Sequence, residues 1–87
     1  MVRVPVVVKQ DIPSIPQNLV AISKPRGLVE VIIDEQGRVV GMTMRASIHP
    51  SYDAMVLGAA RDWKYQPAQL NGEPVRFRRL MSVAVKR

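Results

Sequence analysis

The clearest pattern in the chain is an alternation of apolar and polar residues on either side of a short turn sequence. In segment 28–33 the residues are mostly β-branched and the apolar odd-numbered positions share one face, and alternation resumes in segment 38–46. Between the two segments, Asp34 can close a turn through its side chain and Gly37 can adopt a positive φ. The pattern therefore predicts two strands joined by a tight turn.

Beyond Pro50 the apolar period changes from two to about 3.6 residues, which is typical of a helix with one apolar stripe. Pro50 suits the first helical position, so we expect a helix over residues 50–63 that is stopped by Pro67. Gly58 is unfavourable inside a helix and indicates the close approach of another element. The apolar stripe consists of Tyr52, Met55, Val56, Ala59, Ala60 and Trp63.

Four prolines interrupt the N-terminal quarter of the chain, so regular structure there is expected in short pieces. Residues 4–9 favour an extended segment, and Pro16 can begin a short helix over residues 17–22. We therefore expect residues 1–12 to be an extended N-terminal segment or the end of a linker. Residues 13–87 are then expected to form the domain.

The C-terminal part predicts a second turn at residues 71–74 and a third strand over residues 75–85. Arg79 falls on the apolar parity of this strand. Two explanations stay open at this point: a β-bulge near Arg79 shifts the register, or the charged end of Arg79 reaches solvent from the edge of the sheet.

The resulting order of elements is short helix, strand, strand, helix, strand. Strands with one apolar face and a helix with one apolar stripe predict an α+β fold, a small three-stranded antiparallel sheet with two helices packed on one face. Trp63 is the largest available contributor to the core, since aromatic side chains bury about 150–250 Å² each. A three-stranded sheet also leaves two edge strands.

Composition narrows the functional classes. A chain of 87 residues with 47% apolar and 23% charged residues is an ordinary single globular domain. No apolar run approaches the roughly 20 residues that span a bilayer. The absence of cysteine excludes a disulfide scaffold, a thiolate metal site and a thiol nucleophile, and a single histidine excludes a histidine-rich metal site. We predict no cofactor and no metal.

Catalytic chemistry is not indicated either. Asp34 and Glu35 are adjacent in a turn, which directs their side chains apart, unlike an acid–base pair that faces across a cleft. His49 precedes Pro50 at a helix start, where a capping or surface role fits better than a general base. The five glycines are too scattered to form a phosphate-binding loop. We therefore expect no enzyme and no catalytic residue.

The net charge of +6 is concentrated in part along the last strand. Such a basic stripe is compatible with binding nucleic acid, but base stacking also needs exposed aromatic side chains, and two of the four aromatic residues already belong to predicted core faces. A solvated charged edge that discourages aggregation is the commoner explanation, so we expect no nucleic-acid partner. The stripe consists of Arg76, Arg78, Arg79, Lys86 and Arg87, with Phe77 between them.

A strand at a sheet edge presents a row of unpaired N–H and C=O groups, which is the requirement for recognising an extended peptide by strand addition. The arginines would favour acidic flanks in such a peptide or speed the encounter with it. Pairing of two copies through the same edge, giving a homodimer, is nearly as well supported.

Several sequence motifs resemble the C-terminal domain of TonB-type energy transducers. Segment 27–39 fits Gly-x-Val-x-Val followed by Asp-x-x-Gly-x-Val, and Met42, Met44 and Ser47 continue the match. The predicted helix ends in Trp63-Lys64-Tyr65-Gln66-Pro67, and Gly72-Glu73-Pro74-Val75 resembles the entry into the last strand of the family. Pro13-Ser14-Ile15-Pro16 stands where the family usually has Pro-x-Tyr-Pro, with Ile15 in place of Tyr.

The resemblance implies a periplasmic domain that grips a short "box" segment of outer-membrane transporters by adding it as a strand beside the last strand. It also implies a longer protein, in which a Pro-rich linker and an N-terminal transmembrane helix connect this domain to a proton-driven motor in the inner membrane. A TolA-like or peptidase-attached envelope domain that mainly dimerises is an alternative, as is a basic nucleic-acid-binding module. Pro13, Ile15 and Pro16 would neighbour the gripping edge, which would comprise Val75, Arg76, Phe77, Arg78, Arg79, Leu80, Met81, Ser82 and Val83.

Overall fold

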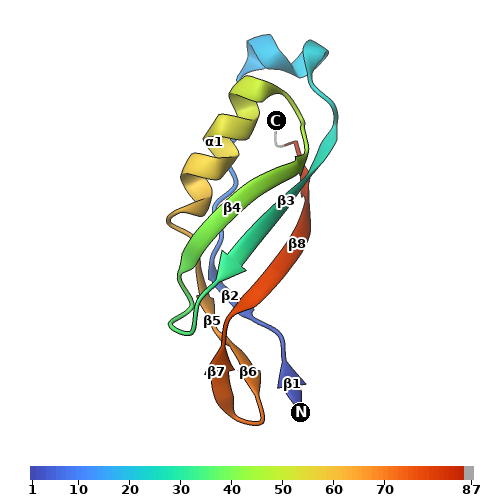
Figure 1. The fold of residues 1–87 in the computed structure, drawn as a ribbon. Coiled ribbons are helices and arrows are strands. Elements are labelled where there is room, and N and C mark those ends of the chain that lie inside the picture. Colours follow the sequence, from blue (N-terminus) through green and yellow to red (C-terminus); the bar gives the residue numbers. More distant parts are fainter. Residues whose placement is uncertain (86–87) are drawn as a thin grey trace.

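The structure, a computed structural model, describes residues 1–85 and has an α+β fold (Figure 1). Its main sheet has three antiparallel strands, with β3 (Arg26–Ile33) between β4 (Val39–Ala46) and β8 (Phe77–Ala84). Strand β3 alternates strictly, and its odd-numbered residues are buried. The predicted three-stranded antiparallel sheet is therefore confirmed.

The turn between β3 and β4 is closed by Asp34, as the sequence predicts. Its Oδ1 accepts hydrogen bonds from the backbone N–H groups of Gln36 (2.9 Å) and Arg38 (2.8 Å), and Gly37 has φ of 81°. Desolvation acts to raise the pKa of the Asp34 carboxyl, but these N–H donors and the Arg38 guanidinium outweigh it and lower the pKa. The carboxylate is therefore held in its charged form by the turn that it closes.

Strand β8 pairs with β3 without interruption, from Ile33 opposite Phe77 to Arg26 opposite Ala84. The β-bulge near Arg79 considered above is therefore wrong, and Arg79 stays on the same face as Met81 and Val83. The single predicted strand over residues 75–85 is also wrong in one respect. It is broken at Arg76, because β7 (Glu73–Val75) pairs with β6 (Ala68–Leu70) and not with β3.

Helix α1 (Pro50–Ala60) begins as predicted, with Pro50 in its first turn. His49 is the N-cap, and its Nδ1 accepts a hydrogen bond from the Ser51 N–H (3.1 Å). The predicted end is wrong: the helix stops at Ala60, before Trp63, because residues 64–66 form strand β5. A methyl group at Gly58 would meet no atom of another element within 4 Å, so the predicted close approach there is wrong too.

The second predicted helix is a single short 3₁₀ helix, η1 (Gln17–Ile22), in which Leu19 is the buried residue. It lies at one end of the molecule beyond the sheet (Figure 1). One α-helix, and not two, therefore packs along the sheet. A six-residue segment that follows a proline and precedes Pro25 has too few hydrogen bonds to sustain α-helical turns.

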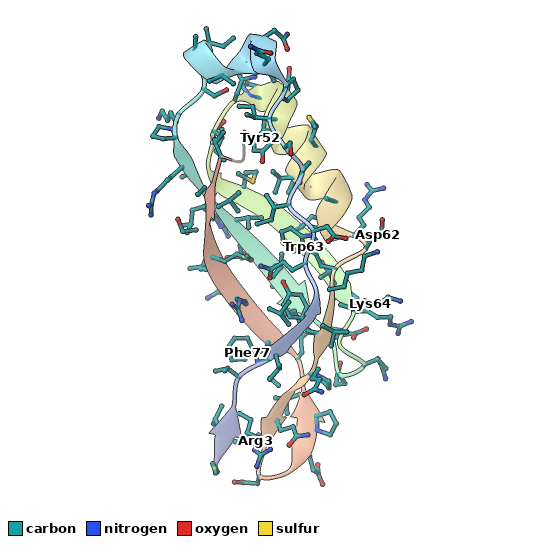
Figure 2. All side chains as sticks on the ribbon, turned by 180° about the vertical axis from the view of Figure 1, so that it is seen from behind. Arg3, Tyr52, Asp62, Trp63, Lys64 and Phe77 are labelled. Atoms are coloured by element: carbon teal, nitrogen blue, oxygen red, sulfur yellow. The ribbon has the colours of Figure 1, made fainter. Side chains whose placement is uncertain are left out.

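The N-terminal residues are extended, as expected, and they pair with distant strands. Strand β1 (Val2–Arg3) pairs with β6, and β2 (Val6–Lys9) pairs with β5 (Lys64–Gln66). Three aromatic side chains form hydrogen bonds to residues 10–13, and Figure 2 labels two of them, Tyr52 and Trp63. The Trp63 indole donates to the Asp11 carbonyl (2.8 Å), the Tyr65 hydroxyl to Gln10 Oε1 (2.6 Å) and the Tyr52 hydroxyl to the Pro13 carbonyl.

The core lies between the inner face of the sheet, helix α1 and this N-terminal segment. Trp63, at 1% exposure, is its largest side chain. The fold is elongated, with extents of 47 × 18 × 18 Å. Within residues 1–85, no helix is both long and apolar enough to cross a membrane. The core residues are Ile15, Leu19, Val29, Val31, Ile33, Ile48, Tyr52, Val56, Ala60, Trp63, Tyr65 and Val83.

Candidate functional site

Strand β8 is an edge strand of the main sheet. It pairs with β3 on one side, and no other strand within residues 1–85 pairs with its outer side. In Figure 1 it runs along the side of the sheet opposite to β4 and α1. The outer edge of β8 is therefore open along the length of the strand.

Two hydrogen bonds determine which backbone groups of β8 face outward. The Val85 N–H donates to the Pro25 carbonyl (3.0 Å), and on the other side of β3 the Asp34 N–H donates to the Arg38 carbonyl (2.9 Å). Because antiparallel pairs alternate in their hydrogen bonding, odd-numbered residues of β8 bond to β3. The even-numbered residues direct their N–H and C=O groups outward, and these are Arg78, Leu80, Ser82 and Ala84.

The side chains of β8 alternate between two environments. The inner face is increasingly buried toward the C-terminal end, from half-buried Phe77 to fully buried Val83. The outer face is exposed, and Leu80 there is 56% accessible. An added strand would thus meet core-facing side chains on one face and solvent-facing side chains on the other.

Positive charge gathers at the N-terminal half of this edge. Arg78 lies 3.8 Å from Glu30, which Arg45 also contacts at 3.2 Å, and Arg76 lies 4.0 Å from Glu35. The Arg79 guanidinium lies 6.0 Å from the centre of the Tyr65 ring. Burial raises the pKa of the Tyr65 hydroxyl, and the charge of Arg79 opposes that effect. Lys86 and Arg87 of the predicted stripe lie outside the described residues.

Residues 26–84, which include the whole of the main sheet and α1, match the family described as Gram-negative bacterial TonB protein C-terminal. The chain belongs to the TonB C-terminal domain family. The predicted family membership is therefore confirmed. Domains of this family are periplasmic, non-enzymatic protein-interaction domains of Gram-negative bacteria. No curated protein matches the chain.

The Pro13-Ser14-Ile15-Pro16 motif precedes the part of the chain that matches the TonB family. Ile15 is 7% exposed and belongs to the same core cluster as Leu19 and Val83, and the Pro13 carbonyl accepts the Tyr52 hydroxyl. This motif contributes to the core of the TonB domain. Its buried isoleucine does not lie on the outer edge of β8.

The sequence missed two residues that shape the edge of this TonB domain. Glu30 pairs with arginines from both neighbouring strands, and its position as the one acidic residue on the polar face of segment 28–33 was an available signal. Tyr65 lies under Arg79, and no local pattern connects the two. Their contact joins β5 to β8, two strands that belong to different sheets.

The structure of the TonB domain gives little support for base stacking or metal binding. Tyr52, Trp63 and Tyr65 are buried, so their rings are not available for stacking on bases. Within the described residues 1–85, no group of three or more His, Asp and Glu side chains could hold a metal ion.

Proposed function

We propose that this domain binds an extended segment of an outer-membrane transporter by strand addition at the outer edge of β8. The observation that carries the proposal is the row of outward N–H and C=O groups on Arg78, Leu80, Ser82 and Ala84. Each of these residues offers one donor and one acceptor, so an extended peptide can form a continuous ladder with them.

In the longer protein that we propose, the domain is the periplasmic end of a TonB-type energy transducer. A Pro-rich linker and an N-terminal transmembrane helix connect it to a proton-driven motor in the inner membrane. The grip on the transporter segment then passes the motor's energy to the outer membrane. Family membership supports this role, and the bound strand is the mechanical link that it requires.

Amide hydrogen exchange measured by NMR tests the proposal directly. The probe is a synthetic peptide that carries the box segment of an outer-membrane transporter. In the free domain, the outward amides of Leu80 and Ser82 should exchange quickly while those of Arg79 and Met81 are protected by β3. Saturating peptide should protect Leu80 and Ser82. No added protection at these amides, with binding detected elsewhere, would overturn the proposal.

A proline substitution supplies the complementary test. Ser82→Pro removes an outward N–H from the edge, where proline is tolerated, and should abolish peptide binding in a folded domain. Ser82→Ala keeps the N–H and should bind like the wild type. Met81→Pro removes an N–H that bonds to β3 and should instead destabilise the sheet. Unchanged affinity of folded S82P would contradict strand addition.

The same measurements separate the alternatives. Two copies that pair through β8 would protect Leu80 and Ser82 without peptide, and this protection would increase with protein concentration. A nucleic-acid binder would bind single-stranded oligonucleotides with an affinity that falls steeply with salt.

A further inference from the structure

Arg79 occupies an unusual position for a charged residue. It lies on the core-facing side of β8, directly opposite Val31, which has no exposed surface. The register on either side of it is unbroken, so the backbone does not turn the side chain away from the core face. Arg79 is half-buried as a result.

Arg79 also differs from its neighbours in its charge partners. Arg78 and Arg76 each lie within 4.0 Å of a glutamate carboxylate. Among residues 1–85, no carboxylate lies within that distance of the Arg79 guanidinium, which instead rests over the Tyr65 ring. Of these three arginines, Arg79 is the one whose charge the described domain leaves without a counter-ion.

The aromatic partner holds Arg79 in place without neutralising it. Tyr65 is 4% exposed, its hydroxyl donates to Gln10 and its backbone N–H donates to the Gly37 carbonyl, so both the end of the side chain and the backbone are held in place. A cation over such a ring is favourable, but the charge remains. A partly buried charge is stabilised most by an opposite charge that also forms hydrogen bonds, and a carboxylate does this for arginine in two-pronged geometry.

The geometry of strand addition brings a side chain to this point. Because the even-numbered residues of β8 form the outward hydrogen bonds, Arg79 would form a non-hydrogen-bonded pair with an antiparallel added strand. In such pairs the Cα atoms lie about 4.5 Å apart and the two side chains share one face. The residue opposite Arg79 would therefore project onto the inner face beside its guanidinium.

We propose that Arg79 is a specificity determinant of the β8 edge and selects extended peptides that carry an aspartate or glutamate on the inner face opposite it. The inference rests on the proposed function, since it requires an added strand. It assigns to Arg79 a role that Arg78, already paired with Glu30 on the outer face, does not share.

The test uses capped peptides of Thr, Ser and Val, about ten residues long, in which a single Glu is moved along the sequence. Binding should be strongest with Glu at one position. Changing that Glu to Gln should weaken binding about tenfold, as for loss of a charge-assisted hydrogen bond of about 1.4 kcal/mol. In R79Q, the Glu and Gln peptides should bind equally.

Arg78→Gln is the matched control, because it removes the same charge from the adjacent residue on the other face. R78Q should keep the tenfold preference for Glu, although both variants slow association equally at low salt. Arg79→Lys should keep part of the preference, since lysine supplies the charge without the planar fork. A preference lost equally in R78Q and R79Q would overturn the proposal.

Two further outcomes are informative. If Arg79 only discourages aggregation at a sheet edge, R79Q will self-associate and still discriminate Glu from Gln, which overturns the proposal. If no peptide protects the Leu80 and Ser82 amides, strand addition itself fails. Protection without any Glu preference would instead leave strand addition standing and remove the role of Arg79.

Discussion

Two glycines with nearly the same φ have very different surroundings. Gly37 and Gly72 have φ of 81° and 85°. A methyl group at Gly37 would lie 1.8 Å from the Tyr65 carbonyl oxygen, whereas one at Gly72 would meet nothing within 4 Å. At residue scale, Gly37 therefore sets how closely the β3–β4 turn approaches strand β5.

We expect Gly37→Ala to lower the free energy of unfolding by more than about 2 kcal/mol, because it combines left-handed strain with a backbone clash. Gly72→Ala is the matched control and should cost only about 1 kcal/mol, the cost of the strained φ alone. Urea denaturation measures both. Equal losses of unfolding free energy in the two variants would show that the close approach of Gly37 to Tyr65 does not contribute to the effect of the substitution.

Asp34 makes the stability of the fold depend on pH in the acid range. Folding lowers the pKa of the Asp34 carboxyl below its ordinary value of 3.8. The charged carboxylate therefore stabilises the fold fully at any pH above 3.8. That stabilisation is lost as the pH falls through the lower pKa of the folded state. We expect Asp34→Asn to be less stable than the wild type at pH 7, with a gap that narrows below about pH 4. Urea midpoints from pH 7 to pH 3 measure the gap. A constant gap over that range would contradict the assigned role of the carboxylate.

At the scale of elements, what could be predicted from sequence depended on how local each interaction is. The β3–β4 hairpin and the start of α1 follow from short-range patterns, namely alternation around Asp34 and a proline after His49. Strands β1 and β2 could not be predicted as paired strands, because their partners lie near the opposite end of the chain. The end of α1 was missed for the same reason, since the chain turns at residues 61–63 and then pairs as β5 with the distant β2.

In the candidate site, too, local features could be predicted from sequence and long-range contacts could not. Alternation predicted the strand and the parity of Arg79, and the fold confirms that β8 lies at an edge. Which residues direct their amides outward depends on the register with β3, and that register has no local signal. The contact between Arg79 and Tyr65 likewise joins segments that only the folded chain brings together.

Helix α1 offers a stabilising change. Gly58 is exposed in the last turn of the helix, with open space around it. We expect Gly58→Ala to raise the free energy of unfolding by about 0.5–1 kcal/mol, because alanine loses less backbone freedom on folding. Thermal unfolding followed by circular dichroism measures the effect. A lower melting temperature would indicate that Gly58 makes a contact absent from the described domain.

At the scale of the whole molecule, the N-terminal segment packs against the core and shields it from solvent. Residues 10–13 receive hydrogen bonds from Tyr52, Trp63 and Tyr65, and Ile12 packs against the core cluster. Strand β1, in contrast, is exposed in both its residues. Pro5 is buried and β2 pairs with β5, so the N-terminal segment contributes to stability from residue 5 onward, most of all through residues 10–13.

Truncation tests this division. A chain that begins at residue 13 should lose more than about 2 kcal/mol of unfolding free energy, since it uncovers Trp63 and Tyr65 and removes the acceptors of their hydrogen bonds. A chain that begins at residue 5 should lose less than about 1 kcal/mol, because only exposed residues are removed. Urea denaturation of the two chains provides the comparison. Equal stability of the 13–87 chain and the full chain would place the domain boundary at residue 13.

The elongated shape has a mechanical consequence for any strand held at the outer edge of β8. The edge strand runs along the length of the molecule (Figure 1), which is 47 Å long and 18 Å across. Tension applied along that length would slide an added strand against β8, so its backbone hydrogen bonds would have to break together. Tension applied across the length would peel them apart one after another. The direction of the applied force, as much as the number of hydrogen bonds, would therefore determine the force at which the added strand dissociates.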